Sequence, residues 1–178
     1  MKHLSIKKMS MIALFTALLC VSAYIAIPLP FTPTPITTQS IMVYMIGILS
    51  SPLEAFITLI LYLLLGMIGL PVFSGGRGGL IVLLGPTGGY IIGWTISVVF
   101  ISLLKGKKNS AKRYFLLILL LGLPITYLFG SLSMKYHTNL SGTKLFYASV
   151  LPFLPLDIIK AVLSCTLACT LKKKLRNL

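Results

Sequence analysis

Long apolar runs, separated by short polar or basic segments, fill most of this sequence of 178 residues. A helix needs about 20 predominantly apolar residues to cross the hydrocarbon core of a bilayer. Six runs approach or reach that length, at approximately residues 9–27, 36–50, 53–70, 83–104, 114–132 and 145–171. Hydrophobic residues make up 57% of the chain and charged residues only 10%, which excludes a water-soluble fold and a disordered chain. The sequence therefore predicts an all-α polytopic membrane protein with six transmembrane helices and a single domain over residues 1–178.

The distribution of basic residues predicts how these helices are oriented. Twelve of the 16 Lys and Arg residues lie in three short segments, at residues 2–8, 105–113 and 172–176. Positively charged residues next to transmembrane helices stay on the cytoplasmic side. Four apolar runs separate the first segment from the second and two separate the second from the third, so all three segments fit on the same side. We therefore expect both the N- and the C-terminus in the cytoplasm.

Composition also bears on the other classes of function. The basic segments flank apolar runs and lack interleaved aromatic residues, so they are expected to contact the bilayer surface and not nucleic acid. The two histidines lie in polar segments and the three cysteines lie in apolar runs, which leaves no constellation of metal ligands. The apolar runs also lack a nucleophile with a clear base or a pair of carboxylates. We predict no catalytic residue, no metal and no cofactor, and a binding function is favoured over an enzyme.

Pro- and Gly-rich segments fall on the outer side in this topology. Residues 28–40, 71–89 and 133–155 form the outer connections, whereas the inner side holds the basic segments and a tight turn at residues 50–54. Non-helical backbone at membrane depth is tolerated only where it is buried in protein or lines a cavity. We therefore expect a cavity in the outer half of the bundle.

Asp157 and Lys160 are the sharpest candidates for a binding site. They follow a Pro-rich stretch, at the predicted outer end of the last helix. Asp157 would lie in the first turn, where the helix dipole favours a carboxylate, and Lys160 would lie three residues further along the same face. Charged residues in transmembrane segments usually face the interior and mark a functional site. Two interpretations stay open: an acceptor and a donor for a polar ligand, or an ion pair that only caps the helix.

Other polar and small residues allow two interpretations each. Gln39 could bind a ligand with its amide or form a hydrogen bond between helices. Glu54 is expected to cap the helix that begins beside it. The glycines of residues 75–79 and 85–89 lack the lysine of a phosphate-binding loop, but they could bring backbone groups close to a ligand, form a lid or serve as flexible loops. Ala13 and Ala17, four residues apart, would let another helix of this chain or of a partner pack closely.

Four segments together resemble the signature of a known family. They read PLPFTPTPITTQ at residues 28–39, GLPVFSGGRGG at 69–79, GPTGGYIIG at 85–93 and LPFLPLDIIK at 151–160. In this order they are similar to the motifs of the BioY family, the biotin-specific substrate-binding (S) subunits of energy-coupling-factor (ECF) vitamin transporters. The resemblance implies a six-helix protein of the bacterial plasma membrane that captures biotin at its extracellular face.

The resemblance also implies partners. An S subunit of this kind works with a transmembrane coupling subunit and two cytoplasmic ATPase subunits, so ATP would be used by the partners and not by this chain. Ala13 and Ala17 match the alanine motif with which such subunits contact the coupling subunit.

The resemblance places Asp157 and Lys160 in the biotin pocket, with residues 71–89 near it as a lid. We expect Asp157 to accept a hydrogen bond from a ureido N–H, and Lys160 or Arg77 to pair with an oxygen at one end of the ligand. Further expected contacts are polar groups and aromatic rings, from Gln39, Gly75, Gly76, Gly78, Phe31, Phe73 and Tyr90. The chain departs from the family at Leu156, where glycine is usual and where leucine would change how Asp157 is presented. Two alternatives remain, an S subunit for another small vitamin and a membrane scaffold subunit without a small ligand.

Overall fold

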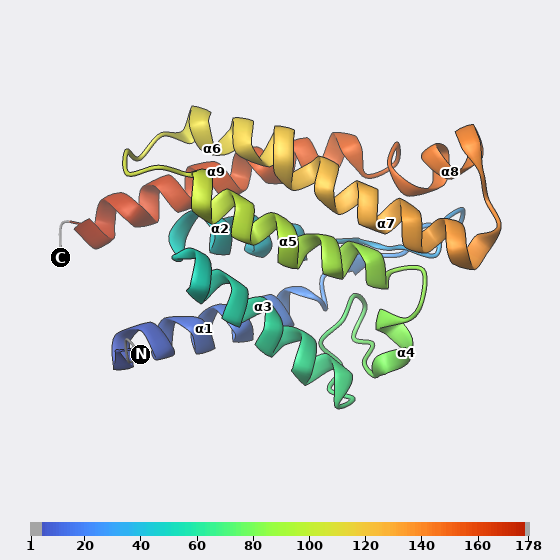
Figure 1. The fold of residues 1–178 in the computed structure, drawn as a ribbon, viewed down its shortest axis with the longest axis horizontal. Helices are drawn as coiled ribbons and strands as arrows, with labels where there is room; N and C mark the ends of the chain where they lie inside the picture. Colours follow the sequence, from blue (N-terminus) through green and yellow to red (C-terminus); the bar gives the residue numbers. More distant parts are fainter. Residues whose placement is uncertain (1–4, 177–178) are drawn as a thin grey trace.

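The chain forms a mostly helical bundle with a small sheet at one end (Figure 1). The computed structural model describes residues 5–176. The helices are α1 (Ile6–Ser22), α2 (Gln39–Leu49), α3 (Pro52–Met67), α4 (Leu80–Leu83), α5 (Gly88–Leu104), α6 (Ala111–Leu117), the π-helical segment η1 (Ile118–Gly122), α7 (Leu123–Thr138), α8 (Gly142–Ser149) and α9 (Leu154–Arg176). The strands β1 (Ala26–Ile27) and β2 (Ile36–Thr37) pair antiparallel, with Ala26 opposite Thr37. The prediction of a helical fold is confirmed, and the structure adds two short strands that were not predicted.

Two helical stretches of the described chain are long and apolar enough to cross a bilayer. They cover residues 111–138, with a mean hydropathy of 2.2, and residues 142–174, with a mean hydropathy of 1.7. The first runs through α6, η1 and α7 without a break, while a turn at residues 150–153 divides the second into α8 and α9. The helices α2, α3 and α5 are apolar but shorter.

Two helices begin later than the apolar runs that predict them, because proline and glycine occur near the start of each run. The run at 36–50 begins in β2, and α2 starts only at Gln39, after a segment whose prolines favour extended backbone. The run at 83–104 contains Gly85 and Pro86, and these residues separate the short α4 from α5. The irregular backbone thus gathers at one end of the bundle.

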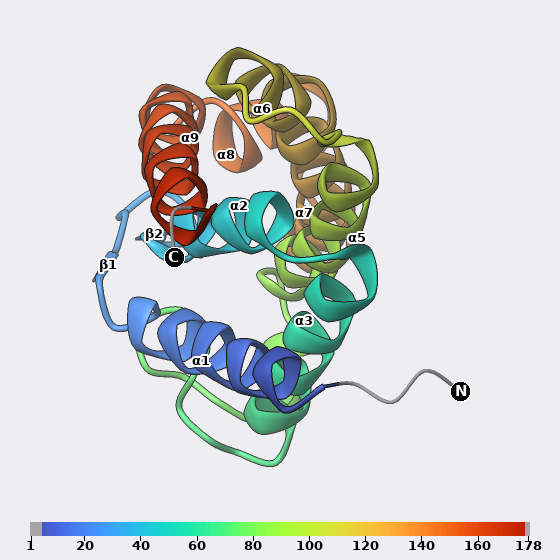
Figure 2. The ribbon, with the colours of Figure 1, turned by 90° about the vertical axis from the view of Figure 1, so that its left-hand side faces the viewer.

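The two ends of the bundle differ in character (Figure 1). The start of α1, the turn between α2 and α3, the loop between α5 and α6 and the end of α9 lie at one end, and the sheet, α4 and α8 lie at the other. Figure 2 shows α2 near the centre, between α1 on one side and α9 on the other. α2 contacts α1, α5 and α9, and α5 in turn contacts α3 and α7. The described lysines of the 105–113 and 172–176 segments lie at the end away from the sheet.

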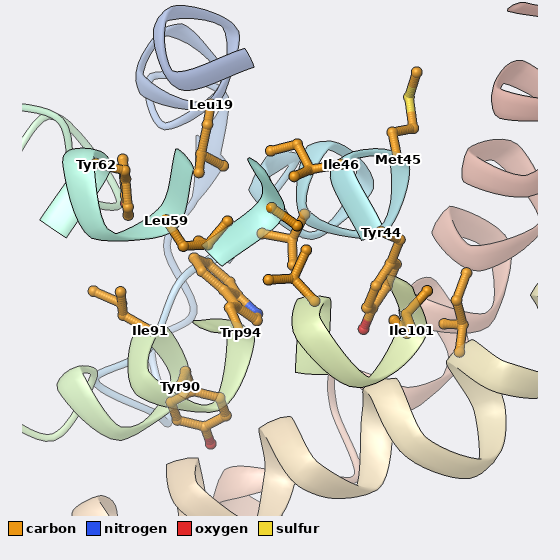
Figure 3. Close-up of a cluster of buried hydrophobic side chains, with 14 of the residues drawn as sticks. Leu19, Tyr44, Met45, Ile46, Leu59, Tyr62, Tyr90, Ile91, Trp94 and Ile101 are labelled. Carbon is orange, nitrogen blue, oxygen red and sulfur yellow. The ribbon is translucent and has the colours of Figure 1, made fainter. Parts of the chain in front are cut away.

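Apolar side chains from several helices meet in the middle of the bundle (Figure 3). Leu19 of α1, Ile46 of α2 and Leu59 of α3 are fully buried there. In a bilayer, lipid tails are as apolar as these side chains, so close packing and not water exclusion stabilises the helix contacts. Small residues are therefore important where two helices cross.

The contact between α5 and α7 depends on glycines. Gly89 and Gly93 lie four residues apart on α5 and face α7. A Cβ at Gly93 would stand 2.8 Å from Cα of Thr126, and one at Gly89 would overlap the backbone of Phe129. This spacing of two small residues is the GxxxG pattern that lets membrane helices approach closely.

Glu54 caps α3, as the sequence predicts. The backbone N–H of Ser51 donates a hydrogen bond of 3.0 Å to the Glu54 carboxylate. The same carboxylate lies 3.3 Å from the ammonium group of Lys8 on α1. Glu54 thus stabilises the start of α3 and links it to α1, at the end of the bundle away from the sheet.

Candidate functional site

A cavity lies at the sheet end of the bundle, as expected from the irregular backbone there. It encloses about 520 Å³ of space that protein atoms leave free, part of it open to the outside. The part of it that is open to the centre of a water-sized molecule is about 40 Å³, so the cavity is narrow in this structure. The lining residues come from the 34–37 segment, α2, the 71–79 connection, α5, α7 and the start of α9: Thr34, Pro35, Ile36, Thr37, Ser40, Tyr44, Ser74, Thr87, Tyr90, Ile91, Trp94, Thr126, Tyr127, Phe153, Asp157 and Lys160.

Asp157 and Lys160 form the charged part of the wall. The Lys160 ammonium donates a hydrogen bond of 2.9 Å to Oδ1 of Asp157, and the Tyr127 hydroxyl donates one of 2.8 Å to Oδ2. Asp157 is buried, with 9% of its surface exposed. A carboxylate can accept about four hydrogen bonds and an ammonium can donate three. The pair is therefore an internal ion pair that keeps both acceptor and donor capacity for a ligand.

The start of α9 explains how Asp157 is presented. Pro155 occupies the second position of the helix, where the missing N–H needs no partner within the helix. The Asp157 N–H donates a hydrogen bond of 2.8 Å to the Phe153 carbonyl, which closes the first turn. Leu156 does not line the cavity and is 39% exposed. A leucine in place of the usual glycine is thus compatible with Asp157 in the cavity wall.

Aromatic side chains form the apolar part of the wall. Tyr90 and Trp94 lie four residues apart on α5, and Tyr44 of α2 also lines the cavity (Figure 3). The Tyr90 and Phe153 rings have centroids 6.2 Å apart in an edge-to-face arrangement. The Tyr90 hydroxyl donates a hydrogen bond of 2.7 Å to the Ser149 carbonyl, which fixes the ring. The sequence motif pointed to Tyr90 but not to Trp94, although the spacing of the two residues on one helix face was a signal for both.

Tyr127 and Thr126 reach the cavity from α7, directly after the π-helical segment. Ser97 of α5 and Thr126 both donate hydrogen bonds to the Gly122 carbonyl, at 3.1 Å and 2.8 Å. A π-helical turn holds an extra residue and leaves carbonyls free for such side chains. The wide turn therefore determines in which direction Tyr127 points from α7. The apolar pattern of the sequence did not indicate this turn.

Two hydroxyls in the cavity wall lack a protein partner. In the described part of the chain, Oγ1 of Thr34 and Oγ of Ser40 are buried without a hydrogen bond. Both residues line the cavity. Almost all buried polar groups in proteins are paired, and an unpaired one costs about 1–3 kcal/mol. These hydroxyls are therefore suited to bind a polar ligand, and nothing in the sequence pointed to either of them.

Gln39 lies beside the cavity and not in its wall. Its side chain is fully buried, and its amide donates hydrogen bonds of 2.6 Å to the Tyr62 hydroxyl and 3.5 Å to the Val72 carbonyl. The Ser74 hydroxyl donates one of 3.0 Å to the Gln39 carbonyl oxygen. Ser74 does line the cavity. Gln39 thus links α2 and α3 to the glycine-rich connection, in line with the structural interpretation of this residue.

The turn at residues 73–77 keeps Arg77 outside the main cavity. The Phe73 N–H donates to the Arg77 carbonyl at 2.8 Å, and Gly75 and Gly76 have positive φ angles of 74° and 71°. Phe73 is fully buried with its ring edge toward Tyr62, so it anchors the turn and does not face the cavity. Arg77 and Gly75 line a second, neighbouring cavity.

The remaining residues from the sequence analysis lie apart from the main cavity. Gly78 packs against the backbone of Leu70, and Gly76 lies near the Tyr24 ring. Phe31 is 62% exposed on the 28–35 segment. Ala13 and Ala17 are exposed on the same face of α1, away from the bundle.

Comparison with known proteins identifies the family. The sequence model of the BioY family matches residues 1–177. This chain belongs to the BioY family. The resemblance of the four sequence motifs is thereby confirmed over almost the whole chain.

Individual BioY relatives extend this match. A protein of Pyrococcus horikoshii named as a probable biotin transporter BioY is 38% identical over 162 residues, which cover 91% of this chain and 94% of the relative. The biotin transporter BioY of Thermotoga maritima is 37% identical over 160 residues, covering 90% and 92%. The crystal structure of an S-component for biotin from an ECF-type ABC transporter superposes with a TM-score of 0.85 at 28% identity, over 94% of this chain and 92% of that one. A transporter component of this kind is a membrane protein, in agreement with the two long apolar helical stretches.

Proposed function

We propose that this chain is the biotin-binding S-component of an ECF-type ABC transporter, and that it captures biotin in the cavity beside Asp157. The observation that carries the proposal is the cavity itself. Its wall holds the Asp157 carboxylate and the Lys160 ammonium, which both keep free hydrogen-bonding capacity, together with two unpaired hydroxyls and several aromatic rings. The names of the BioY relatives and of the similar crystal structure support the identity of the ligand.

The chemistry of biotin matches the parts of this wall. Biotin has a ureido group with two N–H donors and a carbonyl, an apolar bicyclic body and a carboxylate on an alkyl chain. Asp157 is suited to accept from a ureido N–H, while Lys160 donates to an oxygen of the ligand. The hydroxyls of Thr34 and Ser40 supply further donors or acceptors. The Trp94 ring offers a flat apolar surface for the bicyclic body, as is usual in ligand sites.

The proposed topology has six transmembrane spans in the bacterial plasma membrane, with both termini in the cytoplasm. The arrangement of the bundle supports it, because the lysine-rich 105–113 and 172–174 segments lie at the end away from the cavity (Figure 1). With these segments in the cytoplasm, the cavity opens toward the outside, where an uptake system meets its substrate.

The proposed partners are a transmembrane coupling subunit and two cytoplasmic ATPase subunits. The exposed position of Ala13 and Ala17 on α1 supports a contact with another helix, since small residues allow close approach in the membrane. The ATPase subunits would supply the energy for uptake, because the sequence contains no phosphate-binding motif with the required lysine.

Isothermal titration of the detergent-purified protein tests this function. We expect saturable binding of biotin, and no comparable heat with a panel of other vitamins. Tight binding of a different vitamin would identify another S subunit, and no binding of any panel member would favour a scaffold role. Both outcomes would overturn the proposal.

A further inference from the structure

A second cavity, more open than the first, adjoins the proposed biotin site. It lies between the 28–35 segment and the 73–77 turn and holds about 630 Å³ of space, including space open to the outside. Its lining consists of Ala26, Pro28, Leu29, Thr32, Pro33, Pro35, Ser74, Gly75 and Arg77. Pro35 and Ser74 line both cavities. The two spaces therefore share a wall, which these two residues form.

Arg77 gives the second cavity a positive charge. Among the described residues that line it, Arg77 alone is charged, and the other side chains are apolar or neutral. The Arg77 Nε–H donates a hydrogen bond of 3.0 Å to the Ser74 carbonyl. This bond holds the stem of the guanidinium group and uses one of its five N–H donors. The remaining donors match the planar geometry of a carboxylate.

The turn that carries Arg77 is firmly anchored. Phe73 fits against Gly66 of α3 so closely that any Cβ at Gly66 would overlap the Phe73 ring. The backbone pair between Phe73 and Arg77 then fixes the arginine relative to this anchor. A charged group held in place before the ligand arrives loses little entropy on binding.

Another part of the lining of the second cavity is apolar and stiff. It contains Pro28, Pro33 and Pro35, whose φ angles are fixed by their rings, and Leu29 beside them. Such a wall fits the hydrocarbon part of a ligand. The second cavity therefore combines one cation with an apolar surface, which suits an apolar molecule with one carboxylate.

We propose that the second cavity is an outer docking site, in which Arg77 binds the carboxylate of the incoming ligand before the ligand passes Pro35 and Ser74 into the inner cavity. This inference rests on the proposed function, since biotin is such a monocarboxylate. Arg77 then accelerates association by attracting and holding the anion, and it makes no contact that lasts in the final complex. Attraction of this kind raises the association rate and is screened by salt.

Stopped-flow fluorescence tests the outer site. Trp94 is the single tryptophan of the sequence and lines the inner cavity, so its emission reports arrival there. We expect Arg77→Gln to lower the association rate constant for biotin roughly tenfold at low salt, with a dissociation rate constant within twofold of the wild type. The uncharged methyl ester of biotin should bind the wild type and the variant at equal rates. Lys144→Gln, which removes an exposed cation of α8, should leave all rates unchanged.

Three results would overturn the outer site. A faster dissociation with unchanged association would make Arg77 a contact of the final complex. Equal rates for Arg77→Gln and the wild type would remove Arg77 from the pathway. An equal loss in Lys144→Gln would reduce the effect to the overall charge of the protein. Absence of biotin binding to the wild type is a different result, since it overturns the proposed function itself.

Discussion

Tyr127 of α7 donates a hydrogen bond of 2.8 Å to Oδ2 of Asp157 on α9, in the wall of the main cavity. The bond joins two helices whose contributing residues are 30 positions apart in the sequence. Because Lys160 occupies the other oxygen, the carboxylate is held from both sides. Its orientation is thus fixed before a ligand enters.

Removal of the Tyr127 hydroxyl should weaken biotin binding. A hydrogen bond to a charged group contributes about 1.5–3 kcal/mol, and Tyr127→Phe would lose it while keeping the ring. We expect a lower affinity in isothermal titration without loss of the folded state. Tyr136→Phe is the matched control, because Tyr136 is exposed on the same helix. Equal affinities of the two variants would show that Tyr127 does not organise the site.

Substitution of Asp157 should affect both binding and stability. Asp157→Asn removes a charged acceptor, and we expect the free energy of biotin binding to weaken by about 1–3 kcal/mol. It also leaves the Lys160 ammonium buried without its counter-ion, which lowers the free energy of unfolding. The double variant Asp157→Asn/Lys160→Met should recover thermal stability and still bind weakly. Wild-type affinity in Asp157→Asn would remove this residue from the site.

Gln39 should control the mobility of the glycine-rich connection. Gln39→Leu would leave the hydroxyls of Tyr62 and Ser74 without their present partner. We expect faster amide hydrogen exchange in residues 71–79, measured by mass spectrometry, while exchange in the 123–138 helix is unchanged. If the connection exchanges at the wild-type rate, its position depends on Phe73 and not on Gln39.

Ala13 should matter for uptake and not for binding. Ala13→Trp places a large ring on the exposed face of α1, far from the cavity. We expect unchanged biotin affinity of the purified subunit and loss of biotin uptake in cells that contain the coupling and ATPase subunits. Val162→Trp, on the exposed surface of α9, should support uptake. Uptake by Ala13→Trp would assign this face to lipid contact.

The glycine contact between α5 and α7 should limit stability. A methyl group at Gly93 would stand 2.8 Å from Cα of Thr126, so Gly93→Ala forces the two helices apart. We expect a loss of about 1–3 kcal/mol in the free energy of unfolding, seen as a lower Tm in detergent. Ile92→Ala, at the exposed neighbouring position, should change the Tm much less. A Tm of Gly93→Ala equal to that of the wild type would contradict the close contact.

The sequence predicted the helical class from the apolar pattern, and it predicted a cavity from the Pro- and Gly-rich segments that interrupt this pattern. It also singled out Asp157, Lys160 and Tyr90, which stand out by charge or by motif. Trp94 and Tyr127 were not singled out, because an aromatic residue in an apolar run can face lipid, core or cavity, and the rotation of each helix decides which. The hydroxyls of Thr34 and Ser40 are ordinary in a sequence and become notable only when burial leaves them unpaired.

Loop residues were harder to interpret for a different reason. Arg77 and Phe73 lie four positions apart in one motif, yet the turn between them sends Phe73 into the bundle and leaves Arg77 exposed. Two glycines with positive φ angles produce this reversal. A motif shows which residues occur together, but the backbone angles decide which of them face the same space.

The π-helical segment has a consequence for the direction in which Tyr127 points. Each residue of a regular helix turns the following side chains by about 100°. A π-helical turn absorbs one extra residue, so the side chains after it keep the faces of a regular helix that is one residue shorter. If the five residues Ile118–Gly122 formed a regular helix instead, Tyr127 would turn by about that angle, out of reach of Asp157. The wide turn of this short stretch therefore aligns the two halves of the site.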